Sequence, residues 1–356
     1  MIEEVIEEVT RIVSPVYLVG GAVRDYIMDR EIDDFDFTTP LTPEEVEKQI
    51  IKNNPGRKIW SPGKRFGTIA TKVYLPKADQ FIKVEITTFR TETYETGSRK
   101  PQVEFTTSLH EDLMRRDFTM NAICIRMKKG RIHIIDPFNG VDDIENEIIR
   151  GVGFPKQRFK EDPLRMLRAC RFAATLGFDI EESTFKKMQS GAIQILNVSK
   201  ERWMIELDKL LQSDHVSKGL NILADSRLLT FMIPELAVQV GFNQMTPHHD
   251  FELWEHTVKV VEAIPKEDLV LRWAGLLHDI GKPFVARVKD NNPNQKIYVG
   301  HEVIGADMVD KLAKHLKWKN DQREEVVKIV AKHLDTKSKL KYYDSGAQKR
   351  REDATS

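Results

Sequence analysis

The pattern of apolar and polar residues changes about 140 residues into the chain. Before that point, short segments alternate apolar and polar residues as half-buried strands do, and they are mixed with helical segments. We expect strands at residues 17–21, 34–39, 67–75, 81–89, 121–127 and 132–138, and helices at residues 2–13, 22–28 and 43–53. The first part of the chain is therefore predicted to be a domain of mixed helix and strand.

After residue 140, apolar residues recur at helical spacing almost everywhere. Helices are predicted at residues 163–177, 201–212 and 215–229, followed by a linker at 234–250, and then at 253–264, 271–282, 301–316 and 323–334. The polar and basic segment 337–356 is expected to fray. We predict four regions, namely a domain at 1–140, a helical body at 141–245, a second helical domain at 246–340 and a flexible tail at 341–356.

Composition narrows the class of protein. The chain has 356 residues, 40% of them hydrophobic, and its 55 basic residues equal its 55 acidic residues in number. A nucleic-acid site must therefore be local, because no global basic field exists. Cys124 and Cys170 sit among apolar residues, which predicts reduced and buried thiols. The acidic N-terminus does not resemble a signal peptide and no apolar run is long enough to span a bilayer, so we expect a cytoplasmic protein with no membrane partner.

Two acids interrupt a segment that otherwise suits a strand interior, in YLVGGAVRDYIMDREIDDFDFTT at residues 17–39. Residues i and i+2 of a strand share a face, so Asp34 and Asp36 project together, away from the two phenylalanines between and after them. Such close carboxylates repel each other unless a cation lies between them, and Mg²⁺ suits an oxygen-rich site that also meets a phosphate. The alternative is an edge strand with one solvated acidic face.

The residues that precede these acids favour the first interpretation. Gly20 and Gly21 lack side chains, so a phosphate can approach the backbone where the next helix begins. Arg24 lies in the first turn of that helix, where its guanidinium can meet the phosphate. The glycine pair, the arginine and the two acids together predict a phosphate and metal site.

A row of charged residues marks one of the predicted helices, in EDPLRMLRACR. Asp162, Arg165, Arg168 and Arg171 recur every three residues and therefore form one slowly drifting row among apolar neighbours. An aspartate accepts hydrogen bonds and an arginine donates a planar fork of them, so the pair can read the edge of a base without a template. The alternative is an aspartate–arginine network that braces a helical bundle.

A second concentration of unusual residues surrounds LLHDIGKP. His278 and Asp279 are adjacent, His256 lies upstream, and His301, His333 and Asp335 lie downstream. Histidine and carboxylate groups are suitable ligands for transition metals, and helices can bring such residues together. The sequence therefore predicts a candidate metal site in the second helical domain.

The head motifs LVGGAVRD and DFDFTT resemble the class II tRNA nucleotidyltransferase and bacterial poly(A) polymerase family, whose catalytic fold is related to that of DNA polymerase beta. The resemblance continues in family order through VEITTFRTETYETGSRKPQVEF, which looks like a third-acid strand and a flexible loop, and through DLMRRDFTMNAI, IIDPFNGVDDI, RFKEDPLRMLRACRFAATLGF and ERWMIELDKLL. It implies an α+β protein, with a nucleotidyltransferase head that holds a mixed sheet, an all-helical neck and body, and a helical HD domain.

The resemblance also assigns roles to residues of this chain. Asp34 and Asp36 correspond to the family's catalytic ligands for Mg²⁺, and Glu85 corresponds to its third acid, which either polarises the attacking hydroxyl or faces solvent. In the family, the residues matching Arg116 and Asp117 contact the nucleotide and help to select ribose. The expected nucleotide-binding residues are Gly21, Arg24, Arg116, Asp117, Asp162, Arg165, Arg168 and Arg171.

The second helical domain resembles the HD phosphohydrolase superfamily through its pattern H…HD…D. This resemblance implies a transition-metal site whose ligands are His256, His278, Asp279 and Asp335, with His301 as a weaker candidate. The alternative is a metal-free helical domain that only grips the elbow of tRNA.

The implied activity is the template-independent addition of the 3′-terminal CCA of tRNA from CTP and ATP. Enzymatic alternatives are a poly(A) polymerase and an A-adding tRNA nucleotidyltransferase. A CC-only enzyme is disfavoured because such relatives lack the loop that TYETGSRKPQVEF resembles. Two alternatives belong to other classes of protein: an HD phosphohydrolase with a regulatory nucleotide-binding head, and a non-catalytic RNA chaperone. The presence of both Asp34 and Asp36 argues against these alternatives, because a binding module would not need paired carboxylates.

Overall fold

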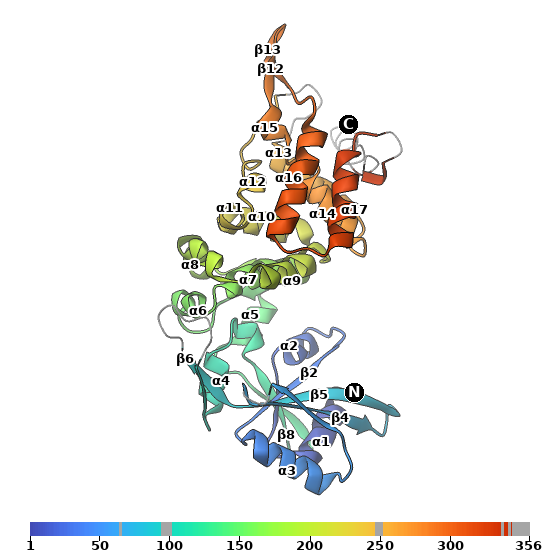
Figure 1. The fold of residues 1–356 in the computed structure, drawn as a ribbon. Helices are drawn as coiled ribbons and strands as arrows, with labels where there is room; N and C mark the ends of the chain where they lie inside the picture. The colour runs from blue at the N-terminus through green and yellow to red at the C-terminus, as the bar shows by residue number, and fades with distance from the viewer. Residues whose placement is uncertain (64–65, 94–101, 246–251, 336–337, 341–342, 344–356) are drawn as a thin grey trace. The chain divides into compact units, whose positions relative to one another are not determined.

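The computed structural model describes residues 1–63, 66–93, 102–245, 252–335, 338–340 and 343. The chain divides into two compact units, Met1–Glu161 and Asp162–Ser356 (Figure 1). The first unit mixes helices with a seven-stranded sheet, and the second is largely helical. The predicted α+β architecture is therefore confirmed. The finer boundaries at residues 140, 245 and 340 stay predictions.

A mixed sheet forms the centre of the first unit. Its strand order is β3-β4-β5-β2-β1-β8-β9. The strands are β1 (Tyr17–Val19), β2 (Phe35–Thr39), β3 (Ile59–Gly63), β4 (Thr68–Leu75), β5 (Gln80–Thr88), β8 (Cys124–Lys128) and β9 (Arg131–Ile135). Strands β2 and β5 run parallel, whereas the other paired neighbours are antiparallel. The parallel pair therefore lies in the middle of the sheet, with two strands beyond β5 and three beyond β2.

Helices α1 (Ile2–Ile12) and α3 (Pro43–Asn53) pack on one face of this sheet (Figure 1). The apolar side of α1 is buried, and α3 begins with a capping box between Thr42 and Glu45. Alternate residues of the strands point to the covered face, where Phe35 and Phe37 are buried. The side chains of the intervening residues, which include Asp36, point away from these helices.

The rest of the first unit consists of short elements around the sheet. They are α2 (Gly21–Ile27), β6 (Arg90–Thr93), β7 (Gln102–Phe105), α4 (Leu109–Met114), α5 (Gly140–Glu145), β10 (Ile148–Ile149), α6 (Pro155–Glu161) and a 3₁₀ turn at Thr119–Asn121. The sequence analysis predicts neither β3 nor the antiparallel pair of β6 and β7. Much of the predicted flexible loop, at residues 94–101, lies outside the described residues.

The second unit begins with a group of helices. They are α7 (Leu164–Leu176), α8 (Glu182–Gly191), α9 (Lys200–Leu211), α10 (Val216–Asp225), α11 (Leu228–Met232) and α12 (Pro234–Ala237), with β11 (Asp179–Ile180) and a 3₁₀ segment at Ala192–Asn197. Helix α7 packs against α9 and α10. The predicted helix at 215–229 is in fact two helices, because Arg227 adopts the left-handed backbone conformation at φ 67°. Trp203 and Leu210 of α9 are fully buried and contribute to the core.

The predicted linker at 234–250 is only partly a linker. Leu236 is fully buried in α12, and Gln239 is buried where its side chain accepts a hydrogen bond from Thr257 at 2.9 Å. Gln244 is also buried and accepts a hydrogen bond from Lys282 at 3.1 Å. These contacts tie the segment to the helices that follow. Residues 246–250 lie outside the described part of the chain, as does most of the predicted tail.

The remaining helices form the part of the second unit that carries the histidines. They are α13 (Leu253–Ala263), α14 (Leu269–Leu277), α15 (Lys282–Val285), α16 (His301–His315) and α17 (Asn320–Ala331), with a hairpin of β12 (Arg287–Lys289) and β13 (Asn292–Ile297). Figure 1 shows this hairpin projecting from the helices. Over the residues that the structure describes, none of the helices combines the length and the apolar character needed to cross a membrane.

A close backbone contact joins α15 to α16. A Cβ atom added at Gly281 would overlap the carbonyl oxygen of His301 and would lie 2.9 Å from the backbone nitrogen of Gly305. A Cβ atom added at Gly305 would meet its nearest neighbour at 3.5 Å, which is an ordinary contact. The two glycines therefore face each other but tolerate substitution differently.

We predict that Gly281→Ala lowers the free energy of unfolding by about 1–3 kcal/mol, because the backbone at His301 must shift. The matched variant Gly305→Ala is expected to be neutral or to gain about 0.5–1 kcal/mol, since alanine is the better residue in a helix interior. Urea unfolding of both variants checks this expectation. Equal stability of the two variants would contradict the close contact.

Candidate active site and metal centre

Two of the three predicted acids are paired on the uncovered face of the head sheet, and the third lies just before it. Asp36 is the direct partner of Glu85 in the parallel pairing of β2 with β5. Asp34 stands one residue before β2, and its charge acts on Asp36. The aspartate side chains are exposed and Glu85 is half-buried. Sheet pairing thus brings together residues that are about fifty positions apart in the chain.

The pKa of Asp36 is raised above its usual value. Desolvation by the surrounding protein is the largest cause, and the negative charge of Glu85 raises the pKa further, as does that of Asp34. The positive charge of Arg116 opposes this rise. Carboxylates that suppress each other's ionisation form a group that a divalent cation stabilises, so the donor set fits Mg²⁺.

Lys83 is a neighbour of these acids that the sequence analysis does not predict. Its Nζ lies 2.6 Å from Oε1 of Glu85, two positions along the same face of β5. This hydrogen bond and the charge of Glu85 raise the pKa of Lys83, and the charges of Asp34 and Asp36 raise it further. Within the described residues, the three carboxylates do not form a group whose ligand oxygens all lie within 4.8 Å of one another.

The glycine turn lies directly beside the acids. Strand β1 runs antiparallel to β2, so the end of β1 and the turn after it lie next to the start of β2. Gly20 has φ 79°, a conformation that favours glycine, and Gly21 opens α2. Arg24 of that helix donates hydrogen bonds to both carboxylate oxygens of Asp25, at 2.9 and 2.8 Å, and to Asn121 at 3.0 Å.

Buried Asp112 organises the two arginines of the RRDFT segment. Its Oδ1 lies 2.8 Å from Arg115 and its Oδ2 lies 3.4 Å from Arg116. Burial opposes ionisation of Asp112 most strongly, but the charges of the two arginines outweigh it, so the pKa of this carboxyl is lowered. Arg116 also lies against Gly20, where an added Cβ atom would approach its Nη1 to 3.4 Å. The glycine turn and Arg116 therefore share one location.

Asn121 connects two residues that the resemblance assigns to the nucleotide. Its side-chain oxygen accepts a hydrogen bond from Arg24, and its nitrogen donates one to Oδ1 of Asp117 at 3.0 Å. The same oxygen of Asp117 accepts a hydrogen bond from the backbone of Phe118 at 2.8 Å. Asn121 lies within the motif NAICIRM but carries no charge, which explains why pattern reasoning passes over it.

In the second unit, the predicted charged row lies on and just before α7. Pro163 precedes the helix, and Gly177 ends it with φ 78°. Arg165 is buried at 7% exposure, and a buried arginine is normally paired. Asp162 lies before the helix, and its Oδ1 accepts a hydrogen bond from the backbone nitrogen of Leu164 at 3.1 Å.

Helix α9 supplies ionic partners to this row. Arg202 of α9 lies 2.8 Å from Oδ2 of Asp162. Buried Glu206, one turn further along α9, lies 2.6 Å from Arg171 and 3.7 Å from Arg168. The pairs hold the side chains of α7 in place. They also match the alternative of a bracing network.

The second unit also contains a buried cluster of histidines around Asp279. The structure brings together His256 of α13, His278 and Asp279 directly after α14, His301 at the start of α16 and His333 after α17. Two groups share Asp279, one with His256 and His278 and the other with His301 and His333. Nε2 of His278 lies 3.1 Å from Oδ2 of the aspartate, and Nε2 of His301 lies 3.2 Å from Oδ1.

Backbone carbonyls fix the orientation of three of these rings. Nδ1 of His278, His301 and His333 lies 2.7 Å from the carbonyl oxygen of the residue three positions earlier in each case. A carbonyl only accepts, so each Nδ1 must carry the proton, and a neutral ring then presents a lone pair at Nε2. Nε2 of His301 faces Nε2 of His333 at 3.2 Å. Two lone pairs that face each other repel unless a cation lies between them, so the cluster fits a transition metal.

Burial and neighbouring charges set the protonation of two members of the cluster. Burial lowers the pKa of His333 to about 4, and the nearby His278 contributes to this, so His333 is neutral near pH 7. Burial opposes ionisation of Asp279, but His278 and Lys282 outweigh it and lower the pKa of that carboxyl well below its usual range. Lys282 lies 2.7 Å from Oδ2 of Asp279. Asp279 is thus ionised and His333 neutral, as metal ligands need to be.

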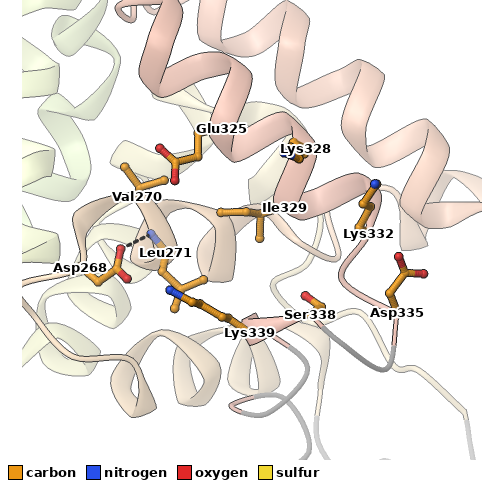
Figure 2. Close-up of a pocket in the computed structure, with 10 residues that line it drawn as sticks. All are labelled: Asp268, Val270, Leu271, Glu325, Lys328, Ile329, Lys332, Asp335, Ser338 and Lys339. Carbon is orange, nitrogen blue, oxygen red and sulfur yellow. Dashed lines mark hydrogen bonds between the residues drawn. The ribbon is translucent and has the colours of Figure 1, made fainter.

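Asp335, which the H…HD…D pattern predicts as a ligand, is not brought to the cluster. Its side chain is exposed and lines a separate hollow of about 500 Å³, together with Lys332 and Ser338 (Figure 2). The chain leaves α17 after Ala331 so that His333, and not Asp335, turns inward. His301, which the sequence analysis ranks as the weaker candidate, lies in the cluster.

Three family models match successive regions of the chain. Residues 16–150 match the family model described as poly A polymerase head domain. Residues 177–239 match the model described as probable RNA and SrmB-binding site of polymerase A, and residues 246–355 match the HD domain. The candidate acids lie in the first match and the histidine cluster lies in the third.

Similar proteins are CCA-adding enzymes. One from Streptococcus agalactiae is 38% identical over 271 residues, which cover 74% of this chain and 64% of the relative. One from Streptococcus suis is 44% identical over 222 residues, which cover 62% of this chain and 51% of the relative. The chain thus spans about half to two thirds of the length of these curated relatives.

A crystal structure of the CCA-adding enzyme of Bacillus stearothermophilus in complex with CTP is also similar. It has a TM-score of 0.62 and 29% identity, and the match covers 99% of this chain and 82% of the other. The three matched domains, the relatives and the fold agree with one another. The chain belongs to the tRNA nucleotidyltransferase and poly(A) polymerase family and carries a C-terminal HD domain.

Proposed function

We propose that this protein adds the 3′-terminal CCA of tRNA from CTP and ATP. The observation that carries this proposal is the register of the head sheet, which sets Asp36 beside Glu85 and next to the Gly20–Gly21 turn. The relatives named CCA-adding enzyme support it, as does the similar structure with bound CTP. A tRNA substrate would place the activity in the cytoplasm.

The proposed step is a nucleotidyl transfer. The 3′-hydroxyl oxygen of the RNA attacks the α-phosphorus of CTP or ATP, the bond from that phosphorus to the bridging oxygen breaks, and pyrophosphate leaves. Glu85 polarises the attacking hydroxyl, and the Gly20–Gly21 turn with Arg24 receives the phosphates. Asp34 and Asp36 would hold Mg²⁺, which when bound supplies positive charge to the reacting phosphoryl group.

Base selection falls to the charged row of the second unit. Asp162 and Arg165 present an acceptor and a donor, and Arg168 and Arg171 add further donors. Their partners on α9 support this role, since Arg202 and Glu206 fix side chains that would otherwise lose rotamer freedom on binding. We infer that Arg116 and Asp117 contact the sugar and phosphate part of a bound nucleotide.

The histidine cluster supports a second activity, a metal-dependent phosphohydrolase reaction. Each oxygen of Asp279 faces a different histidine pair, so the cluster can hold one or two transition-metal ions. Lys282 sits beside it with a charge that would attract a phosphate. His256, His278, Asp279, His301 and His333 are the ligands that we propose.

A single assay tests the main proposal. The protein is incubated with Mg²⁺, a tRNA that lacks CCA, and labelled CTP or ATP, and the product is sized. We expect three added residues with both nucleotides present. A long A-tail would indicate a poly(A) polymerase, and addition only to a tRNA that already ends in CC would indicate an A-adding enzyme. No addition to either RNA would reject all three activities.

Asp34→Asn and Asp36→Asn are each expected to abolish addition of both C and A, because one site serves both nucleotides. The folded-state pKa of Asp36 is raised, so its ionised form destabilises the fold at neutral pH, and asparagine removes that cost. Stability should therefore be unchanged or slightly higher. Asp33→Asn, an exposed neighbour, is the matched control and should remain active. Robust addition by either site variant would reject the assignment.

Asp162→Ala and Arg165→Ala should damage base choice more than the chemical step. Loss of one hydrogen-bonding partner costs on the order of 1–3 kcal/mol, or roughly ten- to a hundredfold in selectivity. The measurement is competition among CTP, ATP, UTP and GTP. Glu182→Ala on the exposed face of α8 serves as the control. Unchanged selectivity in both site variants would leave only the bracing role for this row.

The double change His278→Ala, Asp279→Ala should remove metal-dependent phosphohydrolase activity and leave CCA addition nearly intact. The measurements are hydrolysis of a chromogenic phosphodiester, bound metal per chain, and thermal unfolding with and without added metal. His315→Ala, an exposed histidine at the end of α16, is the control. Loss of CCA addition from a folded double variant would mean that the two sites are coupled.

A further inference from the structure

The candidate acids share a face of the sheet with a row of residues that reaches its far edge. Trp60 of β3 pairs with Ala70 of β4, Ala70 pairs with Glu85 of β5, and Glu85 pairs with Asp36 of β2. Direct partners in a sheet lie on the same face, so these four residues form one line across four strands. With strands roughly 4.8 Å apart, Trp60 lies about 14 Å from Asp36.

Two further rows lie below this line on β4 and β5. Lys72 is the partner of Lys83, and Tyr74 is the partner of Phe81. All four side chains are exposed, and the two aromatic rings contact each other with centroids 5.1 Å apart. Phe81 is 65% exposed and Trp60 is 40% exposed, which is unusual for rings on a sheet face. We call Trp60, Lys72, Tyr74, Phe81 and Lys83 the sheet-face surface.

This surface is hollowed. One hollow of about 690 Å³ is lined by residues that include Trp60, Ala70, Lys72 and Lys83, so it begins beside the partner of Glu85. A second hollow, of about 580 Å³, includes Trp60, Lys72, Tyr74 and Phe81, together with Arg57 and Lys58. Trp60 and Lys72 line both hollows. A continuous concave surface therefore leads away from the candidate acids across the sheet.

Sheet order decides which reactant meets this surface. Strands β1 and β5 flank β2 on opposite sides, and the glycine turn that receives phosphate follows β1. In phosphoryl transfer the attacking and leaving oxygens lie roughly in line on opposite sides of the phosphorus. If the pyrophosphate lies at the β1 turn, the attacking hydroxyl comes from the β5 side, where Glu85 and the sheet-face surface lie.

We propose that the sheet-face surface binds the unpaired 3′ end of the RNA that receives the nucleotide. Exposed aromatic rings interleaved with lysines provide stacking for bases and charge for phosphates, which is the chemistry of single-strand binding. Lys72 has no carboxylate partner among the described residues, so its charge is available to a phosphate. Nearby Asp79 is occupied as the acceptor of the Tyr74 hydroxyl at 2.6 Å. This inference rests on the proposed nucleotidyl transfer and adds the place of its RNA substrate.

The test uses a fluorescent RNA hairpin with an unpaired 3′ end. Its binding to the protein is measured by fluorescence anisotropy at several salt concentrations, and the KM for CTP is measured separately. Trp60→Ala is expected to weaken RNA binding about tenfold, whereas Trp60→Phe keeps a stacking ring and should retain most of it. Lys72→Ala should lower the slope of log affinity against log salt by about 0.7. The KM for CTP should not change in any of these variants.

Ile51→Ala and Lys52→Ala are matched controls, because both residues are exposed on α3, which packs on the opposite face of the sheet. A hairpin with 4-thiouridine in its 3′ end should cross-link to residues 57–83 of the wild-type protein. Circular dichroism checks that each variant is folded, and Lys72→Ala keeps the test valid if Trp60→Ala unfolds.

Two results would overturn the inference, and they differ in what they imply for the activity. If the wild-type protein adds nucleotides but the Trp60 and Lys72 variants bind RNA as tightly as the controls, the proposed function stands and the surface serves another partner, such as a protein. If the wild-type protein neither adds nucleotides nor binds the hairpin, both the function and the surface assignment fail. The inference is supported if RNA binding is weakened in the surface variants and not in the controls.

Discussion

The parallel pairing of β2 with β5 is the constraint on which the head site depends. It fixes a register in which Asp36 lies beside Glu85, while Phe35 and Phe37 of the same strand pack under α1 and α3. Because side chains alternate along a strand, burial of the phenylalanines forces the acids to the uncovered face. A shift by one residue would bury carboxylates in an apolar core, at a large cost in free energy. The hydrophobic core therefore holds the acids in place.

Buried acids hold the cations of both units in a similar way. Asp112 pairs with Arg115 and Arg116 in the head, and Glu206 pairs with Arg168 and Arg171 in the helical unit. A buried ion pair contributes little net stability, since desolvation offsets the attraction. Its value lies in orientation, because a guanidinium held by an acid keeps its remaining donors in a fixed direction.

The histidine cluster depends on the backbone in addition to its charges. Each of three rings is fixed by a carbonyl from the turn before it, so the helix ends set where the Nε2 atoms point. Gly281 allows the start of α15 to come close enough to α16 for His301 to reach Asp279. The geometry of the ligands is thus a property of helix packing, and the charge of Asp279 completes it.

The sequence by itself determines what lies within one element. Strand alternation places Asp36 on the face opposite Phe35 and Phe37, and helical periodicity places the arginines of α7 in a row, because both patterns depend only on local backbone geometry. The tertiary structure alone decides which distant residues join them. His333 joins the cluster while Asp335 faces solvent, and Trp60 aligns with Asp36 across four strands. Sequence spacing carries no such information, since the packing of helices and the pairing of strands set the distance between elements.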